Sequence, residues 1–416
     1  MTRRSVLISG IGIAGPALAH WLLRAGFEPT LVERAPALRT GGYMIDFWGT
    51  GYDVAEAMGL LPAIHDRGYH VREVHLVDRE GRLAGGFTTQ ALDRATDGRF
   101  ISLPRGDLGA ILFRAIERRV RVMFDDTIVR LEPGSSDVLV HFEHAPPERF
   151  DLVIGADGVH STVRSLAFGP EAAYATPLGY TVAAFEVPGY RPRDDGTYVA
   201  YAEPGREIMR FAMRDDRTMF LVVLAGDPGD LSSGSAQRAY IEQHCAAMAW
   251  EAPKVLAELR ACDQLYFDRA LQIRMPRWTT GRIALIGDAA FSPSLLAGQG
   301  SALAIAAAYI LAGELSTAPS IDVAFLRYEH ALRPFLHDKQ VAAARFARAF
   351  APRSRLAIWL RNLVTRAFAI PYVADVALGS TLVDTLDLPD YETFGPLPEL
   401  HRGPAHASVR AESPRR

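Results

Sequence analysis

Residues 5–34 have the sequence SVLISGIGIAGPALAHWLLRAGFEPTLVER, and this stretch decides the fold. It begins with the apolar run Val6 to Ile8, whose lack of alternation is typical of a strand buried on both faces of a parallel sheet. Three glycines follow in the spacing G-x-G-x-x-G: Gly10, Gly12 and Gly15. Apolar residues then recur at helical spacing up to Gly26, and a second apolar run ends in Glu33. The pattern predicts strand, tight turn, helix and strand in succession.

Each part of this pattern has a physical reason. Gly10 permits the tight turn, Gly12 lets the backbone approach a diphosphate, and Gly15 lets helix and strand pack closely. Free N–H groups at the helix start attract phosphates, and an acid at the end of the second strand can accept hydrogen bonds from a ribose. The stretch therefore predicts a dinucleotide site, for which our candidates are Gly10, Gly12, Ala14, Gly15, Glu33 and Arg34.

The composition is that of an ordinary globular protein. The chain has 416 residues, of which 49% are hydrophobic and 22% charged, so it is long enough for two domains or for one domain with an insertion. The net charge of −3 gives no indication of a nucleic-acid partner. Cys245 and Cys262 form neither a disulfide framework nor a metal-ligand pattern, so we expect a reducing, cytoplasmic location and no metal.

Two stretches invite a membrane-related interpretation. Met1 to Arg4, followed by an apolar stretch and Ala17 to Ala19, resembles a twin-arginine signal peptide, but cleavage after Ala19 would delete the dinucleotide turn. Leu295 to Gly313 is nearly free of charge and long enough to be flagged as a membrane helix. Because it follows a glycine-rich turn and contains Gln299 and Ser301, we interpret it as a buried helix and expect no membrane span.

Two further segments could face a ligand. Residues 39–51 are dense in glycine, and such a loop can press its backbone against a flat molecule; Gly42 and Asp46 are our candidates there, although an ordinary surface loop is the alternative. A helix is expected to follow over Asp53 to Leu61, with Asp53 as its cap. Arg105 precedes a helix over Asp107 to Arg119. A cation is unfavourable at a helix start, so Arg105 is expected to face an anion or a polar ligand, with a solvated arginine as the alternative.

The middle of the chain adds a second motif and an insertion. Phe150 to Gly155 is another buried strand, and it is followed by Asp157, Gly158, Ser161 and Arg164. Four aromatic-rich runs with hairpin turns then predict a mainly antiparallel sheet: residues 180–187, 197–201, 207–214 and 217–225.

A third strand over residues 281–286 ends in Gly287-Asp288. Gly298, Gln299 and Gly300 then open the apolar helix, so the arrangement of the opening stretch is repeated. Amphipathic helices are expected over 322–348 and 353–368; they would cover a core, and a role in binding a partner is left open.

The three motifs in this order, with the antiparallel insertion between the second and third, resemble the FAD-dependent class A aromatic monooxygenases of the para-hydroxybenzoate hydroxylase type. The loop over residues 41–46 followed by a helix is most similar to the tetracycline-inactivating and polyketide-modifying branch. The resemblance covers about residues 4–345 and implies FAD, reduction by NADPH or NADH, and insertion of one oxygen atom from O₂ through a C4a-hydroperoxyflavin.

The resemblance also implies roles for the candidates. The first motif and Glu33 would hold the ADP half of FAD, Arg105 would contact the flavin side, and Asp288 the ribityl chain. Asp157, Gly158 and Arg164 belong to a motif associated with both FAD and the pyridine nucleotide, and Gly298 to Gly300 would face the diphosphate and flavin. A second complete G-x-G-x-x-G is absent from the sequence, which agrees with transient docking of the nicotinamide.

The sequence departs from the family pattern at two positions. Phe291 stands where the family usually has histidine, and Leu295 where it usually has proline. The tryptophan-rich motif and catalytic lysine of the related halogenases are not found.

The implied fold class is α/β, with a Rossmann-like FAD-binding domain (GR2-type), an inserted antiparallel substrate domain and C-terminal helices. We assign residues 1–175 and 276–345 to the FAD-binding domain, 176–275 to the substrate domain, 346–395 to the C-terminal helices and 403–416 to a disordered tail. Because the chemistry would reside in the cofactor, no catalytic side chain is predicted. Alternation lets only half of the sheet residues face a pocket. The substrate-binding candidates are Phe185, Arg210, Phe211, Met213, Phe220, Phe291 and Leu295.

These residues favour an apolar aromatic or polyketide-like small-molecule substrate. The expected assembly is a monomer or dimer. Two other functions stay open at this point: a flavin-dependent oxidase or dehydrogenase, and a flavin-binding protein without turnover.

Overall fold

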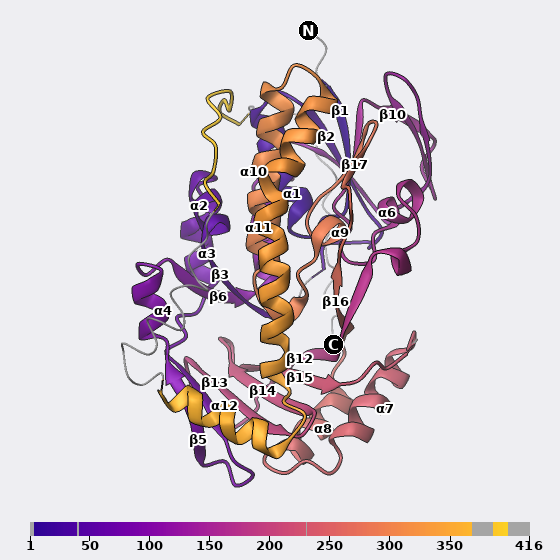
Figure 1. Ribbon diagram of the computed structural model, residues 1–416. Helices are drawn as coiled ribbons and strands as arrows, with labels where there is room; N and C mark the ends of the chain where they lie inside the picture. Colours follow the sequence, from indigo (N-terminus) through magenta and orange to yellow (C-terminus); the bar gives the residue numbers. More distant parts are fainter. Residues whose placement is uncertain (1–3, 40, 230, 368–385, 398–416) are drawn as a thin grey trace, which may run out of the picture.

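The computed structural model describes residues 4–39, 41–229, 231–367 and 386–397. In the upper part of Figure 1, six strands form a sheet in the order β17-β18-β11-β1-β2-β7. Their bounds are Ser5–Ser9 (β1), Glu28–Glu33 (β2), Arg121–Phe124 (β7), Leu152–Gly155 (β11), Thr279–Thr280 (β17) and Ile283–Leu285 (β18). β1 pairs in parallel with β2 and β11, and β11 pairs in parallel with β18, so the predicted buried strands lie side by side. The carboxyl ends of these strands, where each motif begins, therefore meet at one edge.

A seven-stranded sheet forms the lower part of the molecule, in the order β16-β12-β15-β14-β13-β4-β5 (Figure 1). Its strands are Glu73–Val77 (β4), Leu83–Thr88 (β5), Ala175–Pro188 (β12), Thr197–Glu203 (β13), Arg206–Ala212 (β14), Arg217–Ala225 (β15) and Tyr266–Ile273 (β16). The sheet is mainly antiparallel as predicted, with one parallel pair between β13 and β4.

The predicted domain boundaries are wrong for the hairpin β4–β5. We placed it in the FAD-binding part by sequence order, but backbone pairing with β13 makes it part of the seven-stranded sheet. The division of the chain into cofactor-binding and substrate-binding parts stays a prediction. A further three-stranded sheet consists of Ile128–Pro133 (β8), Val138–Phe142 (β9) and Glu148–Phe150 (β10).

Two long helices connect the upper and lower parts of the molecule in Figure 1. α10 (Gly300–Thr317) packs against α1 (Ala14–Arg24), and α11 (Ile321–Phe350) runs beside α10 toward the seven-stranded sheet. α10 has the length and hydropathy of a membrane helix, yet 72% of that segment is buried inside the protein. It is therefore a core helix, as its sequence context predicted.

Shorter helices complete the fold. They are Arg105–Arg114 (α5), Thr162–Ala167 (α6), Glu171–Ala173 (η1), Gly234–Cys245 (α7), Ala252–Ala261 (α8), Asp288–Phe291 (α9) and Leu295–Ala297 (η2). α7 and α8 follow each other closely in the sequence but are separate helices. Trp250, just before α8, has a positive φ of 55°, which is incompatible with a continuous helix.

The loop expected over residues 39–51 contains regular structure. Met44–Trp48 (β3) pairs antiparallel with Phe100–Pro104 (β6), a partner too distant in the sequence for local patterns to reveal. The helix expected over 53–61 is replaced by Thr50–Ala57 (α2) and Leu61–Arg67 (α3), and Gln90–Ala95 (α4) was not expected. Asp53 does not cap α2: the N-cap is Gly49, and Asp53 forms an ion pair with Arg99 at 2.7 Å.

The prediction of helices throughout residues 346–395 is only partly confirmed. α11 ends at Phe350 and α12 covers Arg355–Ala367, but the described segment 386–397 contains no helix. Pro389 and Pro396 lack the N–H groups that a helix needs. Within this segment the ring of Phe394 packs on Trp21 of α1, with centroids 4.8 Å apart. The tail predicted to be disordered, 403–416, lies outside the described residues.

Candidate active site

A cavity of about 280 Å³ lies at the carboxyl ends of β1, β11 and β18 and extends to β16 of the seven-stranded sheet. All three sequence motifs contribute to its lining. The predicted cofactor residues that line it are Gly10, Gly12, Ala14, Glu33, Arg34, Arg105, Asp157, Gly158, Asp288, Gly298 and Gly300. The fold thus brings together residues that are up to 290 positions apart, from Gly10 to Gly300.

The first glycine turn leaves no room for side chains. Gly10 has a φ of 105°, and a Cβ atom on it would lie 2.5 Å from the carbonyl oxygen of Ala156. A Cβ atom on Gly15 would lie 2.0 Å from the carbonyl oxygen of Gly10. Gly15 therefore serves the close packing of the turn on α1 and does not line the cavity.

The carboxylate of Glu33 is fixed at the same end of the cavity. Its Oε2 atom accepts a hydrogen bond from the N–H of Ile11 at 3.0 Å, and its Oε1 atom accepts one from the N–H of Ala35 at 3.0 Å. These bonds hold the acid at the end of β2 beside the glycine turn, which is where a ribose next to a bound diphosphate would present its hydroxyls.

Arg105 and Asp288 approach the cavity from different segments. Arg105 is the first residue of α5, and a Cβ atom on Gly12 would lie 3.5 Å from its Nη2 atom. Burial lowers the pKa of Arg105, but Tyr43, Asp288 and Tyr266 together raise it. Burial raises the pKa of Asp288, while Arg105 opposes the shift. Both groups are partly exposed in the cavity, and each favours the charged form of the other. Arg105 therefore faces the cavity, as one of the two interpretations of its sequence position predicted.

The loop after β11 is organised by Asp157. Its Oδ2 atom accepts hydrogen bonds from the N–H groups of Thr162 at 2.8 Å and Val163 at 3.1 Å, at the start of α6. Burial raises the pKa of Asp157, and these hydrogen bonds lower it in part. The loop is consequently rigid where Gly158 lines the cavity.

Arg164 lies behind this loop and does not line the cavity. It is fully buried and donates hydrogen bonds to the carbonyl oxygens of Val159 at 2.6 Å and Ala289 at 3.0 Å. It also forms an ion pair with Glu171 at 3.0 Å. All of these contacts lie inside the protein. Arg164 therefore positions the loop and does not face the cavity.

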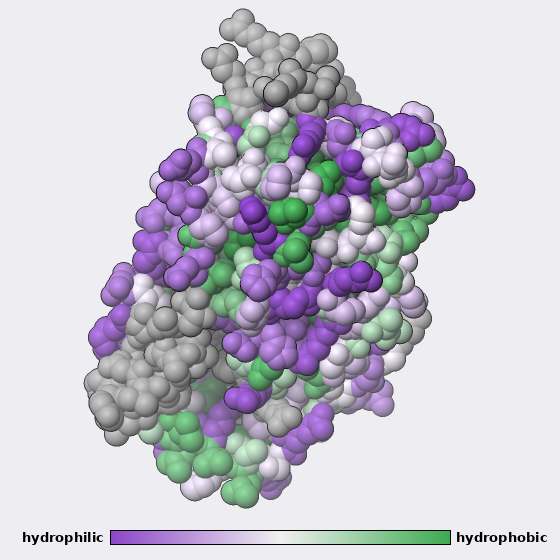
Figure 2. Space-filling model, turned by 45° about the horizontal axis from the view of Figure 1, so that its top comes forward, coloured by the Kyte–Doolittle hydropathy of each residue, from purple (hydrophilic) through white to green (hydrophobic). Residues whose placement is uncertain are grey.

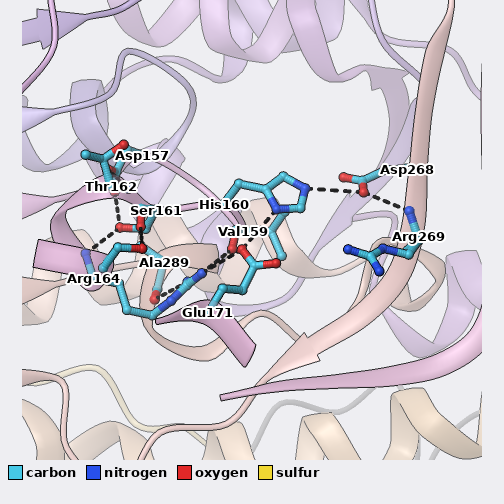
Figure 3. A network of polar contacts seen from close by, with 11 residues as sticks. Asp157, Val159, His160, Ser161, Thr162, Arg164, Glu171, Asp268, Arg269 and Ala289 are labelled. Carbon is cyan, nitrogen blue, oxygen red and sulfur yellow. Dashed lines mark hydrogen bonds and ion pairs between the residues drawn. The ribbon is translucent and has the colours of Figure 1, made fainter. Parts of the chain in front are cut away.

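His160 belongs to the same network and was missed by the sequence reasoning. Figure 3 shows its ring between Glu171 and Asp268. Nδ1 lies 3.0 Å from Oε2 of Glu171, and Nε2 lies 3.3 Å from Oδ1 of Asp268. The two carboxylates, Asp268 first, raise the pKa of His160 to about 9. His160 and Asp268 both line the cavity. The only sequence signal for His160 was its position two residues after Gly158.

The loop before α10 carries backbone strain and an unsatisfied hydroxyl. Ser294 has a φ of 93°, which is rare for a residue with a side chain. Its buried Oγ atom has no hydrogen-bond partner among the described residues, and the residue lines the cavity. Strain and an orphaned polar atom at one position fit a loop shaped to receive a ligand.

Several candidates do not line the cavity. They are Gly15, Gly42, Asp46, Arg164, Gly287 and Gln299 among the cofactor candidates. Asp46 accepts a hydrogen bond from Ser102 on β6, and its neighbour Ile45 lines the cavity instead. Since side chains alternate along β3, only one of these two can face the cavity.

The substrate candidates are divided between two faces of the seven-stranded sheet. Phe185 and Phe220 stack with centroids 5.5 Å apart in a cluster that includes residues of α7 and α8. Arg210 is 4% exposed on that same face, paired with Asp194 and Glu251. These three residues belong to the packing beneath α7 and α8, and the structure does not support a substrate role for them.

Phe211 and Met213 lie on the opposite face, in a cluster with Tyr43, Tyr69 and Tyr266. This face is the one toward the cavity, because Tyr43 and Tyr266 line it. Leu295 lines the cavity directly, whereas Phe291 is 2% exposed and packs on Trp278 in the main core. Tyr43 and Tyr266 were not among our candidates, although Tyr43 stands beside Gly42 in the glycine-rich loop.

Comparisons with known proteins identify the family. A model described as FAD binding domain matches residues 3–320 of the chain. The chain belongs to this FAD-binding family. A flavin-dependent monooxygenase from an unknown prokaryotic organism is 34% identical over 348 residues, which is 81% of this chain and 88% of the relative.

Two further similarities extend this FAD-binding assignment. The FAD-dependent monooxygenase asL6 of Sarocladium schorii is 31% identical over 361 residues, covering 80% of this chain and 85% of that protein. The crystal structure of the tetracycline destructase Tet(55) superposes with a TM-score of 0.79 at 30% identity, covering 94% of this chain and 99% of that one. The predicted resemblance is confirmed: the protein is a flavoenzyme of the FAD-dependent aromatic monooxygenase class, and its fold is α/β with an FAD-binding domain.

The residues present fit FAD. The turn at Gly10 and Gly12 offers bare backbone at the start of α1, where a diphosphate is favoured. The carboxylate of Glu33 is hydrogen-bonded to this turn. Ser294, in the loop before α10, also lines the cavity, and its hydroxyl has no hydrogen-bond partner among the described residues.

Proposed function

We propose that this enzyme uses NADH or NADPH as a transient co-substrate to reduce its FAD. It then inserts one atom of O₂ into a sizeable, mostly apolar aromatic or polyketide-like molecule. The observation that carries the substrate class is the aromatic cluster on the cavity-facing side of the seven-stranded sheet, with Tyr43, Tyr69, Tyr198, Phe211 and Tyr266. Tet(55), named for tetracycline, supports the same class of substrate.

FAD supplies the electron and oxygen chemistry when it is bound. The side chains of this protein orient the reactants and exclude water, and we assign none of them as a nucleophile. Arg105 and Asp288 would hold the flavin half, while Glu33 and the turn at Gly10 and Gly12 would hold the ADP half. The proposal includes the route of oxygen transfer that the resemblance to the aromatic monooxygenases implies.

The aromatic cluster supports the exclusion of water. The ring of Tyr43 lies on that of Tyr266 with centroids 5.1 Å apart, and Tyr198 lies on Phe211 at 4.6 Å. Burial raises the pKa of Tyr43 to about 12, so its hydroxyl is neutral at physiological pH. A wall of neutral rings is suited to an apolar ring system and keeps bulk water from the reacting carbon.

Location and assembly are also proposals. We place the enzyme in a reducing, cytoplasmic compartment, because both Cys245 and Cys262 are free thiols in the structure. A monomer or dimer is the expected assembly.

The test is ligand-stimulated oxidation of NADPH and NADH by the purified holoenzyme in air, with hydrogen peroxide measured in parallel. A panel of phenols and fused-ring polyketides serves as substrates. We expect at least one ligand to accelerate NAD(P)H oxidation with little peroxide released. Oxidation that always yields an equal amount of peroxide, whatever the ligand, would indicate an oxidase and contradict the proposal.

A further inference from the structure

Helix α12 turns polar side chains toward the protein. Arg361 forms an ion pair with Glu207 of β14, a carboxylate that is 3% exposed. The hydroxyl of Thr365 accepts a hydrogen bond from the N–H of Gly86 on β5 at 3.2 Å. The helix backbone lies so close to β5 that a Cβ atom on Gly85 would be 2.8 Å from the carbonyl oxygen of Asn362. Polar contacts and backbone packing therefore hold α12 on β5 and β14, near the free edge of the seven-stranded sheet.

The opposite face of α12 is apolar and exposed. Its residues recur with the spacing of a single helix stripe, and their exposed fractions run from 47% to 72%: Leu356, Trp359, Leu360, Leu363 and Val364. They make up five of the nine large hydrophobic residues that are exposed in the described part of the chain. Figure 2 shows hydrophobic surface at the lower end of the molecule, the end that carries α12 in Figure 1. An amphipathic helix normally buries such a stripe. α12 instead turns its polar side toward the protein and its apolar side toward the solvent.

The segment of chain that contains this stripe carries charge of one sign. Residues 339–374 contain seven lysine and arginine residues and no aspartate or glutamate. Arg355 and Arg366 are exposed at the two ends of the helix. Two copies of α12 packed against each other antiparallel would bring Arg355 of one helix near Arg366 of the other. Self-association through this face would therefore place like charges together, whereas a partner that is both apolar and anionic would match it.

We propose that α12 binds the surface of an anionic lipid bilayer, lying in the interface with Leu356, Trp359, Leu360, Leu363 and Val364 inserted and the arginines at the headgroups. A strongly amphipathic, low-hydrophobicity helix with basic ends and a tryptophan on its apolar face has the composition of interfacial helices. Tryptophan prefers the boundary between headgroups and acyl chains. The helix lies on the interface and does not span it. This inference does not depend on the substrate or reaction of the enzyme.

The test is co-sedimentation of the full-length FAD-loaded protein with phosphatidylcholine vesicles that contain phosphatidylglycerol, compared with vesicles of phosphatidylcholine alone. We expect at least about tenfold stronger binding to the anionic vesicles. Trp359 is the one tryptophan in the described residues among the exposed large hydrophobic side chains, so its emission should shift to shorter wavelength on binding. The double variant Arg355→Glu/Arg366→Glu and the variant Leu360→Glu should each lose at least about tenfold in vesicle affinity.

Leu326→Glu is the matched control, because Leu326 on α11 is an exposed leucine outside this face, and at 70% it is more exposed than Leu360 at 52%. It should bind vesicles like the unaltered protein, and all variants should retain FAD. Equal sedimentation of Leu360→Glu and Leu326→Glu would overturn the proposal. Two other outcomes would also overturn it. The first is a protein that does not bind vesicles but forms a concentration-dependent dimer, which Leu360→Glu abolishes. The second is Trp359 emission that is already blue and shielded from iodide without vesicles, because another segment of this chain covers the helix.

Discussion

The Nε2 atom of His160 lies 3.3 Å from Oδ1 of Asp268, and this contact joins the loop after β11 to β16 of the seven-stranded sheet. On the other side of the ring, Nδ1 of His160 lies 3.0 Å from Oε2 of Glu171. Since both His160 and Asp268 line the cavity, a protonated imidazole closes one edge of the cofactor pocket. Arg164 forms an ion pair with Glu171 at 3.0 Å, and the charges of Arg164 and Arg269 both lower the pKa of that carboxyl group. The backbone N–H of Arg269 donates a hydrogen bond to Oδ1 of Asp268 at 2.7 Å.

This contact predicts a pH-dependent contribution to stability. The pKa of His160 is raised from 6.5 to about 9 in the folded protein, so its contribution is fully present below about 6.5 and is lost as the pH rises through about 9. The side chain is 45% exposed, and solvent screening should keep the contribution below about 1 kcal/mol. Urea unfolding of the unaltered protein and of His160→Gln at a series of pH values measures it. A difference in unfolding free energy that stays constant from neutral to alkaline pH would refute this assignment.

The glycine turn predicts a steric effect that can be separated from backbone strain. Gly10→Ala and Gly26→Ala both place alanine at positive φ, 105° and 82°, which costs about 1–2 kcal/mol. Only at Gly10 does the new Cβ atom meet backbone, 2.5 Å from the Ala156 oxygen. Gly10→Ala should therefore lower the free energy of unfolding by at least about 1 kcal/mol more than Gly26→Ala, and should reduce FAD content. Equal losses of stability in the two variants, with full FAD content, would show that the turn is not tightly packed.

Glu33 should contribute to FAD affinity. Glu33→Gln removes the charge that accepts the hydrogen bond of Ile11 and that would receive those of the ribose, a loss of about 1.5–3 kcal/mol for a charged hydrogen bond. The Kd for FAD, measured by flavin fluorescence with apoprotein, should rise roughly 10- to 100-fold. Glu28→Gln, at the exposed start of the same strand, is the control and should leave the Kd unchanged. Similar affinities in both variants would argue against the ribose role.

The two faces of the seven-stranded sheet should differ in their effect on substrate. Phe211→Leu alters the cavity-facing cluster, and Phe220→Leu alters the packing beneath α7 and α8. Both are buried, so both should destabilise the protein by about 1–2 kcal/mol. Only Phe211→Leu should raise KM for the stimulating ligand or increase the peroxide released per NADPH oxidised. If Phe220→Leu shifts KM as much as Phe211→Leu does, the substrate lies elsewhere.

The cofactor half of the site was largely predictable from sequence because its rules are local. Gly10, Gly12 and Glu33 lie within one strand-helix-strand unit, and Asp157 and Asp288 each follow a buried parallel strand. Parallel strands bring their carboxyl ends to one edge, so the three motifs were expected to meet there.

The remainder depended on contacts between distant segments. Arg210 and Phe211 are adjacent, and which of them faces the cavity is decided by the side that α7 and α8 cover. His160 became visible only with its partner Asp268, 108 positions away. Arg164 was assigned to the cofactor by resemblance, but it is fully buried outside the cavity lining and donates hydrogen bonds to the carbonyl oxygens of Val159 and Ala289.

The central claim, that the enzyme transfers oxygen from O₂ to an organic substrate, is tested most directly by mass spectrometry of the product formed under ¹⁸O₂. The reaction uses the holoenzyme, NADPH and a ligand that stimulates its oxidation. The account predicts a product that carries a single ¹⁸O atom, whereas the same reaction in H₂¹⁸O under ordinary O₂ should give an unlabelled product. A product without oxygen from O₂, formed with stoichiometric hydrogen peroxide, would contradict it.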